Sequence, residues 1–205
     1  MVEKTAYPFN FDIDLAIETD RPVEFPIRLR VPQWSDEPTV IANGATVTRD
    51  ERGYLVVSKL WKTGDTIHLA LRPSIQGRPA VDGATALSYG PLVFSFPIPE
   101  KPEITQRFPH AEEAGLKGFF GYQYDPVDLS YARRKREWNT AKENFGFEVV
   151  KNEDADLLYP WEQLPIKLRG DMVGENGIAE PVVLQPMGST ILRWTCFPEA
   201  SSQQN

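Results

Sequence analysis

The chain has 205 residues, of which 41% are hydrophobic, and its formal net charge at pH 7 is −7. This length suits one large domain or two small ones. The acidic balance argues against a nucleic-acid surface, which needs a net basic face, and no run of eighteen apolar residues is present to cross a membrane.

Short β-strands are expected through the first part of the chain. Eighteen prolines and fourteen glycines punctuate the sequence into short segments and leave little room for long helices. Apolar alternation with turn signals between the runs is typical of an antiparallel β-sandwich and not of a βαβ fold. The predicted strands of this part are residues 9–17, 23–31, 39–41, 54–59 and 66–71.

The clearest local pattern lies between residues 54 and 71. An alternating run enters the turn Lys62-Thr63-Gly64-Asp65, and a second run leaves it with Ile67, Leu69 and Leu71 on one face. Glycine supplies the positive backbone angle of such a turn, and a period of two gives one buried and one exposed face. The pattern predicts a half-buried antiparallel hairpin.

The second part predicts a further sandwich-like unit. Residues 76–85 are expected to form a connection, residues 86–96 a strand buried on both faces, and residues 97–128 a loop-like segment. The remaining predicted strands are residues 145–151, 166–169, 182–185 and 190–197. The predicted fold is therefore all-β, with two consecutive sandwich units over residues 1–83 and 84–198. The second unit is expected to carry a long loop over residues 97–131, and residues 199–205 to form a disordered tail.

Six motifs in a fixed order resemble one known family. They are YPF at 7–9, FPIRLRVPQW at 25–34, ANG at 42–44, YGPLV at 89–93, REWN at 136–139 and LQPMGSTILR at 184–193. Together with the run at 54–71, they resemble the C-terminal β-sandwich region of glycoside hydrolase family 127, the DUF1680 or β-L-arabinofuranosidase-like proteins. Tyr89 stands where the family usually has Arg, Thr140 where it has Tyr, and residues 99–131 match poorly.

The resemblance implies that catalysis belongs elsewhere. In this family a cysteine nucleophile and a zinc ion lie in an (α/α)6 barrel that precedes the sandwiches, and no residue of this sequence corresponds to that site. A zinc site needs several converging ligands, whereas this chain has one cysteine, Cys196, and two separated histidines, His68 and His110. We therefore expect no catalytic residue, no metal site and no cofactor in this chain.

Three groups of residues invite a functional interpretation. Tyr122 and Tyr124, with Trp138 and Trp161, could stack on sugar rings, although core and loop-anchoring roles are commoner for such side chains. Asp12 and Asp14 lie on one strand face and could act as a glycosidase pair, but solvent-facing charges have the same spacing. The basic run at 133–136 could bind anions or direct localisation, but more often such a run is a solvated loop.

Three functions remain open from the sequence. The first is a non-catalytic sandwich module that supports the barrel, the substrate mouth or dimer contacts of a family 127-like enzyme. The second is a free-standing carbohydrate-binding module whose expected glycan contacts are Tyr122 and Tyr124; the third, which the missing cysteine cluster disfavours, is a hydrolase in its own right. The implied partners are the barrel, a second copy or a glycan, and neither nucleic acid nor a membrane; the sugar and the localisation stay open.

Overall fold

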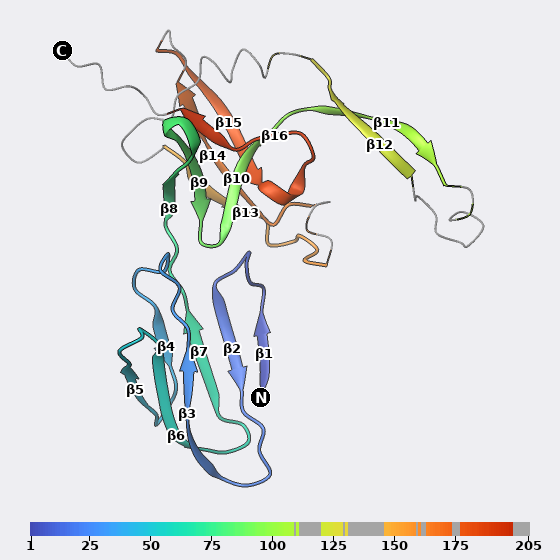
Figure 1. The fold of residues 1–205 in the computed structure, drawn as a ribbon. Coiled ribbons are helices and arrows are strands. Elements are labelled where there is room, and N and C mark those ends of the chain that lie inside the picture. The colour runs from blue at the N-terminus through green and yellow to red at the C-terminus, as the bar shows by residue number, and fades with distance from the viewer. Residues whose placement is uncertain are drawn as a thin grey trace, which may run out of the picture. The chain divides into compact units, whose positions relative to one another are not determined.

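The computed structural model describes residues 1–108, 110, 120–128, 130, 146–158, 160, 163–173 and 177–198, with the backbone alone at Asp82 and Phe120. The chain forms two compact units (Figure 1): unit 1 comprises residues 1–76 and 88–92, and unit 2 comprises residues 77–87 and 93–205. Between residues 76 and 93 the chain passes from unit 1 to unit 2, returns to unit 1 and then enters unit 2 again. The predicted boundary after residue 83 stays a prediction.

Unit 1 is built from two antiparallel sheets. The first has the strand order β1-β2-β7-β4 and the second the order β3-β6-β5 (Figure 1). The strands are β1 (Val2–Thr5), β2 (Asp12–Ala16), β3 (Val23–Leu29), β4 (Thr39–Ile41), β5 (Thr46–Arg49), β6 (Leu55–Trp61) and β7 (Thr66–Ala70). This arrangement confirms the all-β antiparallel sandwich. Two of its strands, β1 and β5, were not predicted. The strand expected at residues 9–17 corresponds to β2, which begins at Asp12.

The core of unit 1 lies between its two sheets. Alternation directs Ile67 and Leu69 of β7 toward Val57 and Trp61 of β6, and all four side chains belong to one buried cluster. Trp61 is completely buried, and its Nε1 donates a hydrogen bond of 2.8 Å to the carbonyl oxygen of Phe25. The apolar faces of the two sheets thus cover one another, as in other sandwiches.

The expected hairpin at residues 54–71 is wrong. Gly64 has the predicted positive φ of 93°, and the Asp65 N–H donates to the carbonyl of Lys62, so the turn forms. However, β6 pairs with β3 and β5, whereas β7 pairs with β2 and β4. The turn crosses from one sheet to the other, because the apolar faces of both strands then meet across the core.

Aromatic side chains close one part of this core. The ring of Phe11 lies in edge contact with the rings of Tyr7, Trp34 and Tyr89, at centroid distances of 6.3, 5.5 and 5.4 Å. Phe11 is buried, and Tyr89 comes from the segment 88–92 that belongs to this unit. Edge-to-face packing of this kind adds to the energy of area burial.

Unit 2 is dominated by one eight-stranded antiparallel sheet. Its main strand order is β13-β14-β15-β10-β9-β17; in addition, β16 pairs with β10 and β8 with β9. Its buried side chains include Leu87, Phe94, Leu168, Leu184 and Phe197. The strands are β8 (Ile75–Pro79), β9 (Ala84–Tyr89), β10 (Leu92–Pro97), β13 (Glu148–Lys151), β14 (Ile166–Val173), β15 (Ala179–Pro186), β16 (Arg193–Trp194) and β17 (Cys196–Pro198), with 3₁₀ turns at Val81–Gly83 and Met187–Ser189.

Two expectations for residues 76–96 are wrong. The expected connection at 76–85 contains most of β8 and the start of β9. The single strand expected at 86–96 is instead two strands, β9 and β10, that are neighbours in the sheet. Gly90 lies between them with a φ of 60°, a left-handed value that favours glycine and that a continuous strand does not contain.

The prediction of a long loop over residues 97–131 is wrong for those residues of the range that the structure describes. They include β11 (Glu100–Arg107) and β12 (Phe120–Pro126), which form a separate two-stranded antiparallel sheet (Figure 1). The pairing register shifts between Ile104 and Gln106. The predicted tail at 199–205 lies outside the described residues. Among the residues that are described, no helix is long and apolar enough to span a membrane.

Candidate functional site

The predicted sugar contacts, Tyr122 and Tyr124, lie together on β12. They share one face of the hairpin with their cross-strand partners, Ile104 and Pro102. The two rings have centroids 5.9 Å apart and an interplanar angle of 43°, and Tyr122 is 44% exposed. A tilted, accessible pair of rings can pack against the apolar face of a sugar.

Of the four aromatic residues that could form a sugar-stacking surface, the structure describes only Tyr122 and Tyr124. Trp138, Trp161 and the basic run at 133–136 lie outside the described residues. On the opposite face of β12, the Gln123 amide donates to the Asp125 carboxylate at 3.0 and 3.2 Å. The hairpin therefore has one aromatic face and one polar face.

Asp12 and Asp14 meet a histidine that the sequence alone did not connect to them. His68 Nδ1 lies 2.8 Å from Asp14 Oδ1, and its Nε2 lies 3.7 Å from Asp12 Oδ1. Arg72 Nη1 approaches Asp12 Oδ1 at 3.8 Å. These side chains are exposed or half-exposed on the outer face of the first sheet, and their contacts are those of surface ion pairs. They favour the interpretation as solvent-facing charges.

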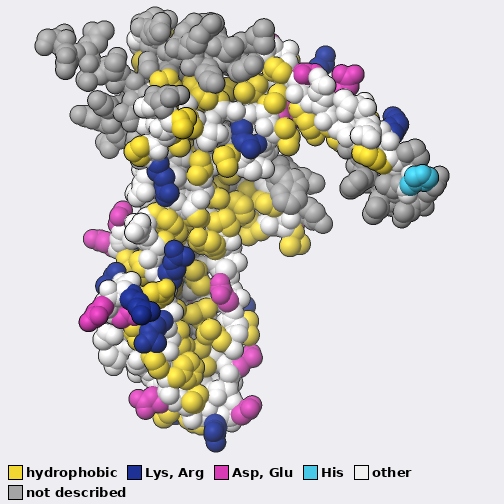
Figure 2. Space-filling model, viewed as in Figure 1, with side chains coloured by type: hydrophobic (Ala, Val, Ile, Leu, Met, Phe, Trp, Pro, Cys, Tyr) yellow, Lys and Arg dark blue, Asp and Glu magenta, His cyan; other side chains and the backbone are white. Residues whose placement is uncertain are grey.

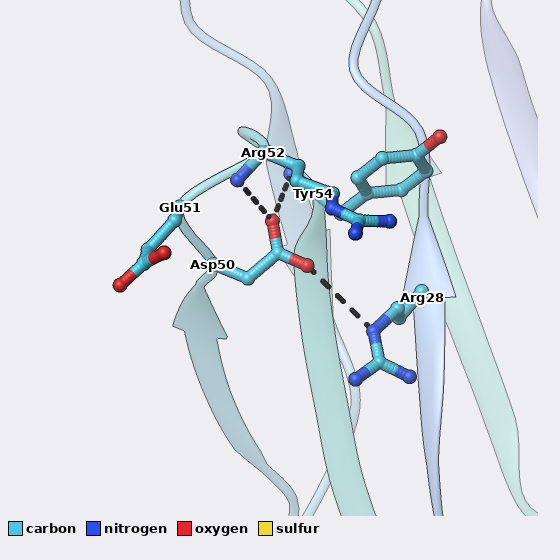
Figure 3. A pocket seen from close by; sticks show the side chains of 5 residues that line it. All are labelled: Arg28, Asp50, Glu51, Arg52 and Tyr54. Atoms are coloured by element: carbon cyan, nitrogen blue, oxygen red, sulfur yellow. Dashed lines mark hydrogen bonds and ion pairs between the residues drawn. The ribbon is translucent and has the colours of Figure 1, made fainter.

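A second polar group of residues lies at the turn between β5 and β6. Arg28, Asp50, Glu51, Arg52 and Tyr54 line a pocket of about 610 Å³ (Figure 3). Asp50 Oδ1 accepts the backbone N–H groups of Arg52 and Tyr54, each at 3.0 Å, and Asp50 Oδ2 lies 3.6 Å from Arg28 Nε. The sequence pattern alone did not predict this pocket. The available signal was the run Asp-Glu-Arg-Gly, since aspartate favours turns that its carboxylate can bond.

Two ionisable groups of unit 1 have shifted pKa values. The hydrogen bonds from the Lys59 ammonium, at 2.6 Å, and from the backbone N–H of Lys62 lower the pKa of the Asp65 carboxyl. Burial raises the pKa of the Tyr89 hydroxyl. Neither group lines the pocket beside Asp50 or lies on the aromatic hairpin.

No cluster of metal-ligating residues occurs in the described part of the chain. Cys196 is partly buried in β17, where its carbonyl oxygen accepts a 2.6 Å hydrogen bond from Trp194 Nε1. His68 is held by the two aspartates. The tyrosine face of the hairpin and the pocket beside Asp50 are candidate ligand sites.

A comparison with models of known families gave a match over part of the chain. Residues 1–72 match the family described as beta-L-arabinofuranosidase, GH127 middle domain. No curated protein sequence matches the chain at a significant level.

Three solved structures have a similar fold. A family 127 β-L-arabinofuranosidase from Geobacillus stearothermophilus T6 has a TM-score of 0.60 and 17% identity, over 95% of this chain and 28% of that one. A further family 127 β-arabinofuranosidase has a TM-score of 0.59 and 19% identity, over 98% and 31%. A protein titled glycoside hydrolase has a TM-score of 0.59 and 14% identity, over 97% and 32%. This chain thus spans about 30% of the length of the proteins that share its fold.

Proposed function

We propose that the chain is a non-catalytic β-sandwich portion of an enzyme of glycoside hydrolase family 127, because its residues 1–72 match the middle-domain model of that family. In this proposal the complete enzyme acts on arabinofuranosyl or related plant-type glycans. The sandwich supports the catalytic barrel, shapes the substrate mouth or mediates dimer contacts.

The observation that carries the proposal is the unequal coverage in the fold comparison. The similarity takes in at least 95% of this chain but at most 32% of each of the three solved proteins. Two of these proteins are arabinofuranosidases by name. A chain with the fold of one part of such enzymes is best understood as that part, with the chemistry left to the remainder.

The surface of unit 1 is consistent with a role in contacting the catalytic barrel or a second copy of the chain. Figure 2 shows hydrophobic side chains along the middle of the visible face of unit 1, with charged side chains around them. Exposed apolar residues of this unit include Tyr7, Val23, Phe25, Ile41 and Leu60. In this proposal, a partner surface on the catalytic region, or on a second copy, covers apolar side chains of this kind.

Hydrolysis assays test the non-catalytic assignment. We expect the purified chain to leave aryl arabinofuranosides and arabino-oligosaccharides intact, with or without added zinc, because the sequence holds one cysteine and two separated histidines. The control is a complete family 127 enzyme under the same conditions. Turnover that co-purifies with the chain, and that is absent from a mock preparation of the host, would contradict the assignment.

A carbohydrate-binding module is the second candidate function. It is favoured by Tyr122 and Tyr124, which share the accessible aromatic face of the hairpin. On this alternative, the chain is a monomer that binds arabinan fragments weakly, and Tyr122→Ala or Tyr124→Ala abolishes the binding. Tyr7→Ala is the matched control, since Tyr7 is 43% exposed in unit 1 and Tyr122 is 44% exposed. Calorimetry with arabino-oligosaccharides decides: absence of any heat of binding removes this candidate.

A further inference from the structure

We propose that the pocket between Arg28 and the β5–β6 turn binds a saccharide that carries a carboxylate group, a uronate. This site is separate from the Tyr122 and Tyr124 face, and the proposal does not depend on the proposed function. Nothing in the family resemblance or the fold comparison assigns a ligand to the Arg28 pocket.

The turn that forms the pocket is held rigid by its own hydrogen bonds. Besides the two bonds to its carboxylate, Asp50 donates its N–H to the Tyr54 carbonyl at 3.0 Å, and its carbonyl accepts the Gly53 N–H at 2.9 Å. Gly53 has a φ of 83°, which suits a glycine at the tip of the turn. Arg52 and Tyr54 therefore project from a fixed backbone, which reduces the ordering cost when a ligand binds.

The charges around the pocket leave one arginine uncompensated. Asp50 balances Arg28 through the contact at Nε, which leaves the two Nη groups of Arg28 available. The Arg52 guanidinium has no hydrogen bond or ion pair to any described residue. Figure 3 shows the Glu51 carboxylate pointing away from Arg52 and Tyr54, so it does not neutralise that charge.

This arrangement fits a sugar acid better than a neutral sugar. A guanidinium presents N–H donors in a planar fork that matches the two oxygens of a carboxylate. Tyr54 is partly buried beside Arg52 in the pocket lining, where its ring can meet the apolar face of a pyranose. The volume of about 610 Å³ falls within the range of ordinary small-ligand sites.

The test is a titration of the full 205-residue chain with trigalacturonate, followed by calorimetry and by the backbone amide signals of residues 50–54. Arabinotriose serves as the neutral comparison. We expect trigalacturonate to bind and to shift these amide signals, with weaker binding at high salt because the contact is ionic. Arg52→Gln and Arg28→Gln should each weaken binding by about tenfold or more, the usual effect of losing a charged hydrogen bond.

Two control variants separate a built site from general electrostatics. Arg30→Gln removes the same charge from unit 1 at a position outside the pocket lining, and it should leave the affinity unchanged. Tyr122→Ala should also leave it unchanged. The proposal is overturned if trigalacturonate does not bind, if Arg30→Gln weakens binding as much as Arg52→Gln, or if arabinotriose binds equally well.

Discussion

Gly90 lies directly against the ring of Phe11: a Cβ atom on Gly90 would be 2.7 Å from Cε1 and 2.9 Å from Cζ of Phe11. Phe11 cannot retreat easily, because its ring already contacts Trp34 and Tyr89. The backbone of Gly90 also has a φ of 60°. Two separate constraints, steric and conformational, therefore require glycine at this position.

Gly90→Ala is expected to lower the free energy of unfolding by about 2–4 kcal/mol, the sum of a strained left-handed residue and an overpacked core. The matched control is Gly44→Ala. Gly44 has a similar φ of 70° but nothing within 4 Å of an added Cβ, so this variant should lose only about 1 kcal/mol. Urea denaturation of both variants measures the difference; equal losses would show that the contact with Phe11 contributes nothing.

Local pattern in the sequence predicted the buried faces of the strands better than it predicted their neighbours. Ile67, Leu69 and Leu71 are all buried, as alternation indicates. Yet the same alternation is compatible with two arrangements, a hairpin within one sheet and a turn that crosses between two sheets. Only the whole set of strands decides between these, because a strand's partner depends on contacts far away in the sequence.

The hairpin β11–β12 escaped prediction for a different reason. Pro102 and Gly121 lie within its strands, and both residue types ordinarily argue against a strand. Its polar face carries Lys101, Glu103, Gln123 and Asp125, which also reads as a solvated loop. The pairing of Tyr122 and Tyr124 on one face was nevertheless accessible from their spacing of two.

For the polar residues too, the sequence pattern did not predict which side chains meet in the fold. Asp12 and Asp14 were expected on one face, but their partner His68 follows Asp14 by 54 positions and reaches it only through the β2–β7 register. The Arg28 pocket likewise joins β3 to a turn more than twenty residues later. Sequence pattern specifies which residues face solvent, while strand register specifies which of them meet.

Because Asp65 is paired with Lys59, we expect the folded chain to lose stability in acid. The pKa of Asp65 is lower in the folded chain than in the unfolded chain, so its contribution is present above the unfolded value of about 4 and is lost as the pH falls through the folded value. Asp65→Asn should therefore be less stable than the wild type at pH 7, with the gap closing in acid. Thermal unfolding across this pH range measures it.

The control for that experiment is Asp20→Asn, at an exposed aspartate that forms no hydrogen bond or ion pair with the described residues. Its stability should follow the wild type at every pH. A gap between Asp65→Asn and the wild type that stays constant from pH 7 into strong acid would rule out the ionised carboxylate as the cause.

Because Tyr89 is partly buried, we expect the folded chain to lose stability in alkali. Because burial raises its pKa in the folded chain, the stabilising contribution is complete below the unfolded value of about 10 and is lost as the pH rises through the folded value. Tyr89→Phe keeps the ring contact with Phe11 but removes the ionisable hydroxyl. We expect this variant to lose less stability than the wild type above pH 10, by urea denaturation; parallel losses in the two proteins would contradict the assignment.

We propose that this chain works as one part of a family 127 enzyme and binds the catalytic barrel of that enzyme. Sedimentation velocity of the chain mixed with the catalytic barrel of the same enzyme tests it most directly, with each component also run alone. We expect a single faster-sedimenting complex, with micromolar affinity or tighter from an interface on the order of 1,600 Å². Two components that sediment independently at every concentration, while the chain alone remains a monomer, would contradict it.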